Sequence, residues 1–137
     1  AETVDAEDIA VLADLYERMD DCQPWEFHRL NRTFHLTVCA AAGNITLYEH
    51  IRGLRYRSDP YVRLLVGAGG GAAAQDGHRE LLGALQEHNT AAARRATRDH
   101  LMTTVNTVTS LLDARRPSPR SPITPSRSPA RAAGRPS

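Results

Sequence analysis

The sequence predicts an all-α protein, an antiparallel bundle of five to six helices followed by a disordered C-terminal tail. Along most of the first 115 positions, apolar residues recur at intervals of three and four, the period of a helix that buries one face. No stretch alternates apolar and polar residues as a half-buried strand does. Glycine, proline and asparagine separate the periodic segments, so the helices can be placed in order.

The first two predicted helices cover residues 3–20 and 24–42. Thr3 or Asp5 can cap the first helix, because both side chains accept a hydrogen bond from the first helical turn. Pro24 suits the first turn of the second helix, where its missing N–H is no loss.

The following segment is predicted as two helices, over residues 44–57 and 61–66, separated by a break at residues 58–60. Gly43 suits the left-handed position after the second helix, and Asn44 can cap the third directly. The break is expected because Pro60 ends the Ser-Asp-Pro sequence and proline disrupts a helix interior. Three residues are predicted to face inward: Leu47, Ile51 and Leu54.

A glycine-rich segment, residues 67–72, is predicted to be a flexible loop between helices. It also matches the pattern G-x-G-x-x-A of dinucleotide-binding sites. Such a site requires a preceding strand and a βαβ unit, whereas the surrounding segments have a helical period. The last two helices are predicted over residues 75–88 and 90–115.

Charge divides the chain into a body, residues 1–115, and a tail, residues 116–137. All 17 basic residues are arginines. Residues 1–113 carry 11 of them against 16 acids, a net charge of −5, whereas the last 24 residues carry six arginines and no acid. An acidic body is not expected to bind nucleic acid by its own field. The tail also contains six of the eight prolines and little apolar surface, so we expect it to be disordered.

Two cysteines, Cys22 and Cys39, are too few for a disulfide framework, so the expected compartment is the reducing cytosol. No apolar run approaches the ~20 residues of a membrane span, and the first residues do not resemble a secretory signal.

Asn31 and His35 are four residues apart on the second predicted helix, so they project from one face. Such a pair is either hydrogen-bonded within the core or half of a metal site completed by other helices. His78 and His100 lie on two later helices and can supply the other half. Imidazole nitrogens and an amide oxygen suit Zn, Ni, Mn or Fe.

The residues around these positions form an ordered set of short motifs. In chain order they read Asn31-x-x-Phe34-His35, Ala41-Ala42-Gly43-Asn44-x-x-Leu47, Ile51-x-x-Leu54-Arg55, His78-x-x-Leu81-Leu82-x-Ala84-Leu85, then Ala93 and His100-Leu101. Over residues 5–113 this set resembles the ligand-binding, or FCD, domain of FadR-type regulators in the GntR family of bacterial transcription factors.

The resemblance implies a non-enzymatic, effector-sensing domain that holds a divalent metal (Zn, Ni or Mn) at the bottom of a cavity. The metal ligands implied are Asn31, His35, His78 and His100. A small organic acid would bind the metal together with a nearby arginine. We expect Arg55 to be that arginine, with Arg52 and Arg79 as weaker candidates.

The resemblance further implies a homodimer and DNA binding through a winged helix-turn-helix domain, for which this chain shows no sequence. The first helix of the FCD domain also has no counterpart here. Asn31 is neutral where many members carry an aspartate, and an amide oxygen compensates less of the metal's charge. Two alternatives remain open: a metal-free dimerisation or interaction module, and a metalloenzyme, which would need a general base that the inward positions lack.

Overall fold

The computed structural model describes residues 4–118, and in that range it contains five α-helices and no strand. The all-α class is therefore confirmed. The tail that was predicted to be disordered lies mostly in residues 119–137, which are outside the described residues. The proposed cap Thr3 is also outside them. The helices are α1 (Ala6–Asp21), α2 (Pro24–Ala41), α3 (Ile45–Gly67), α4 (Gly71–Gln86) and α5 (Thr90–Ala114).

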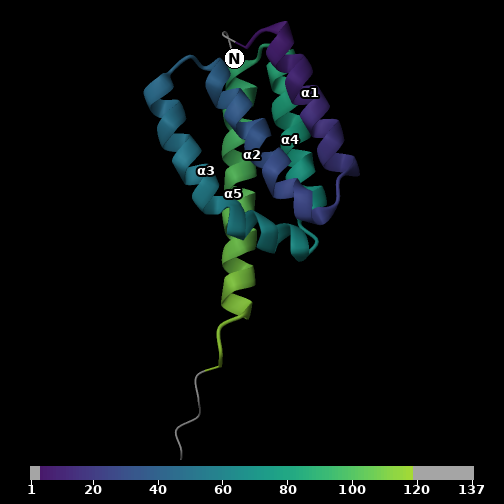
Figure 1. Cartoon of the computed structure of the whole chain (residues 1–137), viewed down its shortest axis with the longest axis vertical. Helices are drawn as coiled ribbons and strands as arrows, with labels where there is room; N and C mark the ends of the chain where they lie inside the picture. Colours follow the sequence, from purple (N-terminus) through teal and green to yellow (C-terminus); the bar gives the residue numbers. More distant parts are fainter. Residues whose placement is uncertain (1–3, 119–137) are drawn as a thin grey trace, which may run out of the picture.

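The helices form a bundle in which α2 lies between its sequence neighbours (Figure 1). It packs against α1 on one side and α3 on the other, while α4 packs against α1 and α5. The C-terminal half of α5 projects beyond the bundle. Among the described residues, no helix is long and apolar enough to cross a membrane.

The helix caps expected at Asp5, Gly43 and Asn44 are confirmed. Asp5 accepts a hydrogen bond from the backbone N–H of Asp8 at 2.9 Å and completes a capping box at the start of α1. Gly43 has a φ of +72°, the left-handed conformation that ends α2. Asn44 and Asn89 cap α3 and α5, because the side-chain oxygen of each accepts a hydrogen bond from the backbone N–H three residues later.

The predicted break at residues 58–60 is wrong, because α3 runs through Pro60 as one helix. Proline cannot donate its backbone hydrogen bond, but the surroundings hold the helix in place. Asp59 forms a shielded ion pair with Arg32 of α2. Val62 and Leu65 follow in the core, so the second half of α3 is held by burial.

The first half of α3 also departs from its predicted orientation. Leu47 is 52% exposed and Leu54 is 56% exposed, so neither faces the core as expected. Ile51 is only partly buried. The Arg32 guanidinium instead lies over the Tyr56 ring, with its Cζ atom 4.1 Å from the centre of that ring. This part of α3 is therefore held by polar and cation–π contacts.

The glycine-rich segment is shorter as a loop than predicted. α3 continues to Gly67 and α4 begins at Gly71, leaving a three-residue connection over 68–70. With helices on both sides and no strand among the described residues, the dinucleotide-binding interpretation has no structural support. α4 ends at Gln86, two residues earlier than predicted, and His88 takes a left-handed φ of +50°.

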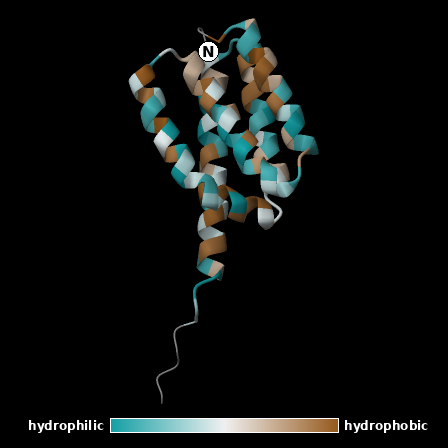
Figure 2. Cartoon of the chain, in the orientation of Figure 1, coloured by the Kyte–Doolittle hydropathy of each residue, from teal (hydrophilic) through white to brown (hydrophobic). Residues whose placement is uncertain are grey.

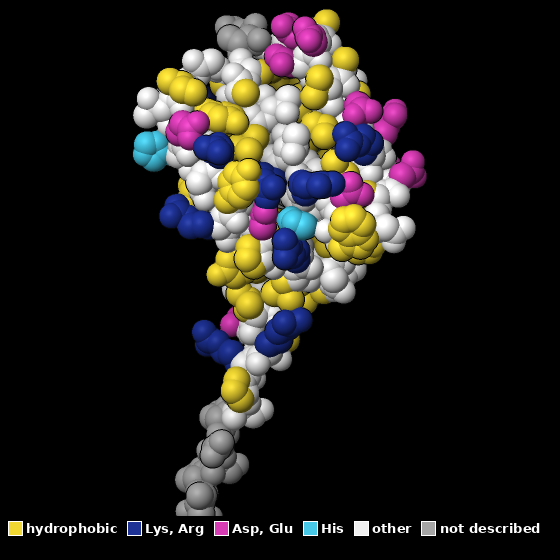
Figure 3. Space-filling model, in the orientation of Figure 1, with side chains coloured by type: hydrophobic (Ala, Val, Ile, Leu, Met, Phe, Trp, Pro, Cys, Tyr) yellow, Lys and Arg dark blue, Asp and Glu magenta, His cyan; other side chains and the backbone are white. Residues whose placement is uncertain are grey.

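The core lies between α1, α2 and α4 and is closed by the first half of α5. Its most buried large side chains are Phe34, Leu12, Leu81 and His78. Figure 2 shows apolar segments along the helices of the bundle and also on the projecting end of α5. Figure 3 shows acidic side chains along α1 and arginines across the middle of the same face.

Candidate metal centre

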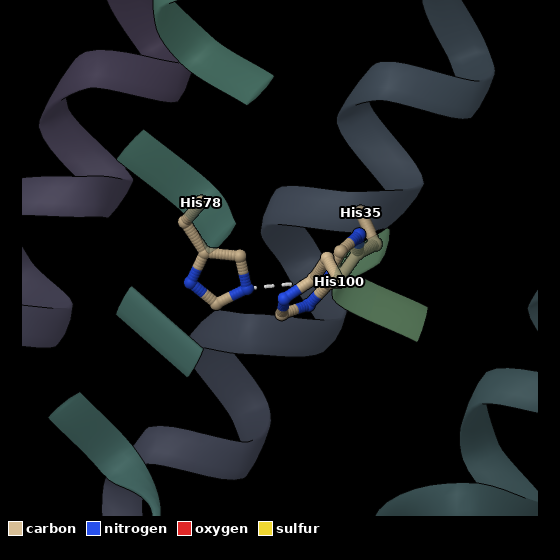
Figure 4. A group of neighbouring side chains, drawn as sticks. All are labelled: His35, His78 and His100. Atoms are coloured by element: carbon tan, nitrogen blue, oxygen red, sulfur yellow. Dashed lines mark hydrogen bonds between the residues drawn. The ribbon is translucent and has the colours of Figure 1, made fainter. Parts of the chain in front are cut away.

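Three histidines from three helices meet inside the bundle (Figure 4). His35 lies on α2, His78 on α4 and His100 on α5, and they are 4%, 0% and 7% exposed. The Nε2 atom of His35 lies 3.2 Å from Nε2 of His78 and 3.2 Å from Nε2 of His100. One ring nitrogen from each histidine lies within 4.8 Å of the others. The structure thus brings together all three histidines singled out in the sequence.

The three imidazoles are neutral at physiological pH. Burial lowers the pKa of His78 to about 3, with smaller effects from His100 and Arg55. Burial, followed by the charge of Arg55, lowers the pKa of His100 to about 4. The pKa of His35 is lowered well below its ordinary value, again mainly by burial. Neutral imidazole is the form that binds metals.

The spacing of His35 from each of the other two histidines suits ligands of one divalent ion. Two imidazole nitrogens bound at ~2.0–2.1 Å to one ion lie about 2.8–3.0 Å apart in an octahedral site and about 3.3–3.4 Å apart in a tetrahedral one. The two Nε2–Nε2 distances of 3.2 Å lie between these values and close to the tetrahedral one. Three buried nitrogens that face one another cannot all point lone pairs at the same space without a proton or a cation between them. The donor set therefore fits a metal bound by three imidazoles.

Asn31 and Arg55 lie beside this trio. Asn31, one turn before His35, is 5% exposed. Together with Arg55 and His100 it lines a small cavity of about 30 Å³. That volume holds about one water molecule. The cavity therefore has room for one water-sized group but not for an organic acid.

Arg55 is a partly buried cation without an acidic partner. Burial lowers the pKa of its guanidinium. The ion pairs found in residues 4–118 do not include it. Its charge also lowers the pKa of all three histidines, which places it close to them. An anion beside the trio would compensate this charge.

The two weaker arginine candidates lie on the surface. Arg52 is paired with Glu49 on its own helix, and the Arg52 side chain is 50% exposed. Arg79 is paired with Asp76 and is 63% exposed. Neither lines the small cavity next to the histidines. Their role in effector binding stays a prediction.

A larger open groove of about 810 Å³ is lined by the three helices that carry the histidines. Each histidine-bearing helix contributes a residue one turn away from its histidine: Val38, Leu81 and Thr97. Leu101 borders both this groove and the small cavity. The groove is mainly apolar, with three arginines of α5 along it: Arg94, Arg95 and Arg98. These arginines lie outside the motifs that mark the histidines.

Two more residues that support the trio escaped the sequence analysis. Gln75 is 5% exposed, and its Oε1 atom lies 2.8 Å from Nδ1 of His78. Gly77 leaves the space that the His100 ring occupies, because a Cβ built there would lie 2.8 Å from the ring Cγ. In the sequence, only their closeness to His78 could have pointed to them: Gln75 comes three residues before it and Gly77 one residue before it.

Comparison with known proteins gives one match. The sequence model of the FCD domain family matches residues 1–103. No curated protein and no solved structure matches the chain.

Proposed function

The chain belongs to the FCD domain family, and from this premise we propose that it senses a small organic acid through a divalent metal, as part of a FadR-type regulator. FCD domains are the C-terminal effector-binding domains of GntR-family regulators, which are not enzymes. DNA would be bound by a separate winged helix-turn-helix domain. The effector-binding domain would extend over residues 1–115. The regulator would act in the cytoplasm.

The metal would be held by His35, His78 and His100, with Asn31 as the oxygen ligand. Support comes from the burial, neutrality and 3.2 Å spacing of the imidazole nitrogens. Zn, Ni and Mn all suit three imidazoles and one amide oxygen. When bound, the metal would supply a positive charge with open coordination positions.

The observation that carries the effector proposal is the unpaired charge of Arg55 beside the trio. A carboxylate bound there would contact the guanidinium and reach the metal, which compensates two positive charges at once. The small cavity has space for about one oxygen atom of the acid. The body of the acid would extend past Leu101 into the groove, where Arg94 and Arg98 lie on the rim.

We expect a metal-dependent thermal stabilisation by small organic acids that requires Arg55. A ligand at about 100 times its Kd stabilises a protein by ~2.7 kcal/mol, which corresponds to a rise in Tm of roughly 8 °C for a domain of this size. The measurement is a thermal-shift screen of mono-, di- and tricarboxylic acids, with and without added metal.

The matched variants are Arg55→Met and Arg57→Met, since Arg57 is exposed on the same helix. The stabilisation should disappear in Arg55→Met and persist in Arg57→Met. An acid that stabilises both variants equally would show that Arg55 does not hold the effector.

A homodimer is the second part of the proposal, and the projecting half of α5 supports it. Leu101, Val105, Val108 and Leu112 recur at intervals of four, three and four, the spacing of a coiled-coil seam. Leu101, Val105 and Leu112 are 40%, 54% and 43% exposed. Threonines and valines are abundant in this half of α5, and such β-branched residues favour helix less than Ala or Leu. A second copy packed on the seam would stabilise it.

Sedimentation velocity over a range of protein concentrations tests the dimer. We expect Val105→Glu to shift the protein to a monomer, because a carboxylate at the seam would be buried without a partner. Thr103→Glu, on the opposite face of α5, should leave the wild-type behaviour unchanged. Equal sedimentation of wild type and Val105→Glu would contradict the seam as the interface.

The seam also favours the alternative function, a metal-free dimerisation module, because it does not involve the histidines. Metal analysis separates the two functions, since a module of this kind would dimerise while binding no metal.

A further inference from the structure

The geometry points to Gln75 as a positioning residue: we propose that it fixes the tautomer and orientation of His78 and ties the histidine trio to the last turn of α1. This inference rests on the proposed metal centre, because it concerns the nitrogen that His78 would present to the metal. It is carried by three hydrogen bonds of one buried amide.

The amide orientation of Gln75 follows from its neighbours. Its Nε2 lies 3.0 Å from the backbone oxygen of Tyr16 and 2.8 Å from Oδ1 of Asp20. Both neighbours are acceptors, since a carbonyl oxygen and a carboxylate have no proton to give. The NH2 group must therefore face α1, and Oε1 must face His78.

This orientation decides which nitrogen of His78 carries the proton. Because Oε1 of Gln75 accepts at 2.8 Å from Nδ1, that nitrogen must donate. The lone pair of the neutral ring is then on Nε2, the atom that faces His35 at 3.2 Å. Hydrogen bonds of this kind to the outer nitrogen orient metal-binding histidines in proteins.

At the α1 end of these hydrogen bonds, an acidic residue occupies a position where helices favour basic ones. Asp20 lies in the last turn of α1, where the helix dipole disfavours a negative charge. Its carboxylate accepts from Gln75, so the unfavourable position is compensated by a contact toward the trio. Such local conflicts are expected near functional sites. The contact also makes the orientation of His78 depend on how α1 packs against α4.

The first experiment compares Gln75→Leu with Gln86→Leu, the same change at the exposed end of α4. Long-range ¹H–¹⁵N correlation spectra of the metal-free proteins report the tautomer of each histidine. We expect His78 to be protonated on Nδ1 in the wild type and in Gln86→Leu, and to lose this preference in Gln75→Leu. Zinc affinity, measured by competition with a chromophoric chelator, should fall about 10–100-fold only in Gln75→Leu.

A second pair on the surface of α1 avoids any change in the core. Asp20→Ala removes one acceptor of the amide and should weaken zinc binding several-fold, whereas Asp21→Ala should have no effect. Circular dichroism checks that all four variants are folded.

The outcomes separate the positioning role from the metal centre itself. A wild-type His78 protonated on Nε2, or a Gln75→Leu variant with unchanged tautomer and zinc affinity, overturns the inference and leaves the metal centre standing. Absence of zinc binding in the wild type, together with a tautomer that depends on Gln75, supports the positioning role and removes the proposed metal function.

Discussion

The purified protein is expected to bind about one divalent ion per chain, and His78→Ala is expected to weaken that binding by at least ~100-fold. Structural zinc sites with four ligands bind with ~10–16 kcal/mol, so each ligand contributes on the order of 3 kcal/mol. His78 is fully buried, and no exposed histidine can replace it without a large movement of the helices. Elemental analysis gives the stoichiometry, and chelator competition gives the affinity.

The controls come from histidines outside the trio. His50 and His88 are exposed, so His50→Ala and His88→Ala should leave the affinity unchanged. His35→Ala and His100→Ala should resemble His78→Ala. Equal affinity in all five variants would mean that any bound metal is held elsewhere, and the metal-free dimerisation module would then be the better description.

The histidine trio could be singled out from sequence, because each histidine lies in a short motif that can be recognised by itself. Asn31 and His35 share a face by their spacing alone, and the surrounding motifs resemble a family whose members place histidines at these positions. The structure adds that Nε2 of His35 lies 3.2 Å from Nε2 of His78 and of His100. Their role as ligands remains a prediction until metal is measured.

Gln75 could not be predicted in the same way, because its partners belong to another helix. Its hydrogen bonds to Tyr16 and Asp20 span 59 and 55 residues of sequence. Which face of α4 meets α1 depends on the rotation of both helices in the bundle, and hydrophobic periodicity fixes that rotation only roughly. A buried glutamine therefore looks the same in sequence as a solvated one.

The errors in α3 have a related cause. Pro60 was expected to end a helix because proline disfavours the helix interior, yet proline kinks some helices without ending them. Contacts with distant residues decide between these outcomes, and here Asp59 pairs with Arg32 of α2. Leu47 and Leu54 have the apolar spacing of a helix, as predicted. Such spacing does not show whether another helix packs on that face, and both side chains are exposed.

Gly77→Ala and Gly83→Ala are expected to have opposite effects, although both make the same change in the interior of α4. Replacing a helical glycine by alanine normally stabilises a protein by about 0.5–1 kcal/mol. Around Gly83 nothing lies within 4 Å of the new Cβ, so Gly83→Ala should show this gain and bind metal normally. At Gly77 the new Cβ would lie 2.8 Å from Cγ of His100 and 3.0 Å from its Cβ.

The contact at Gly77 cannot be relieved by a flexible side-chain end, because the atoms involved are the ring and the Cβ of His100. α5 must therefore move away from α4, or the ring must rotate, at a cost of roughly 1–3 kcal/mol for overpacking. Either movement takes Nε2 of His100 away from its position 3.2 Å from His35. We expect Gly77→Ala to lose stability in urea unfolding and to bind zinc at least ~10-fold more weakly, since metal ligation tolerates only small displacements. A Gly77→Ala protein as stable as Gly83→Ala and with wild-type zinc affinity would show that α4 and α5 are not packed this closely at the trio.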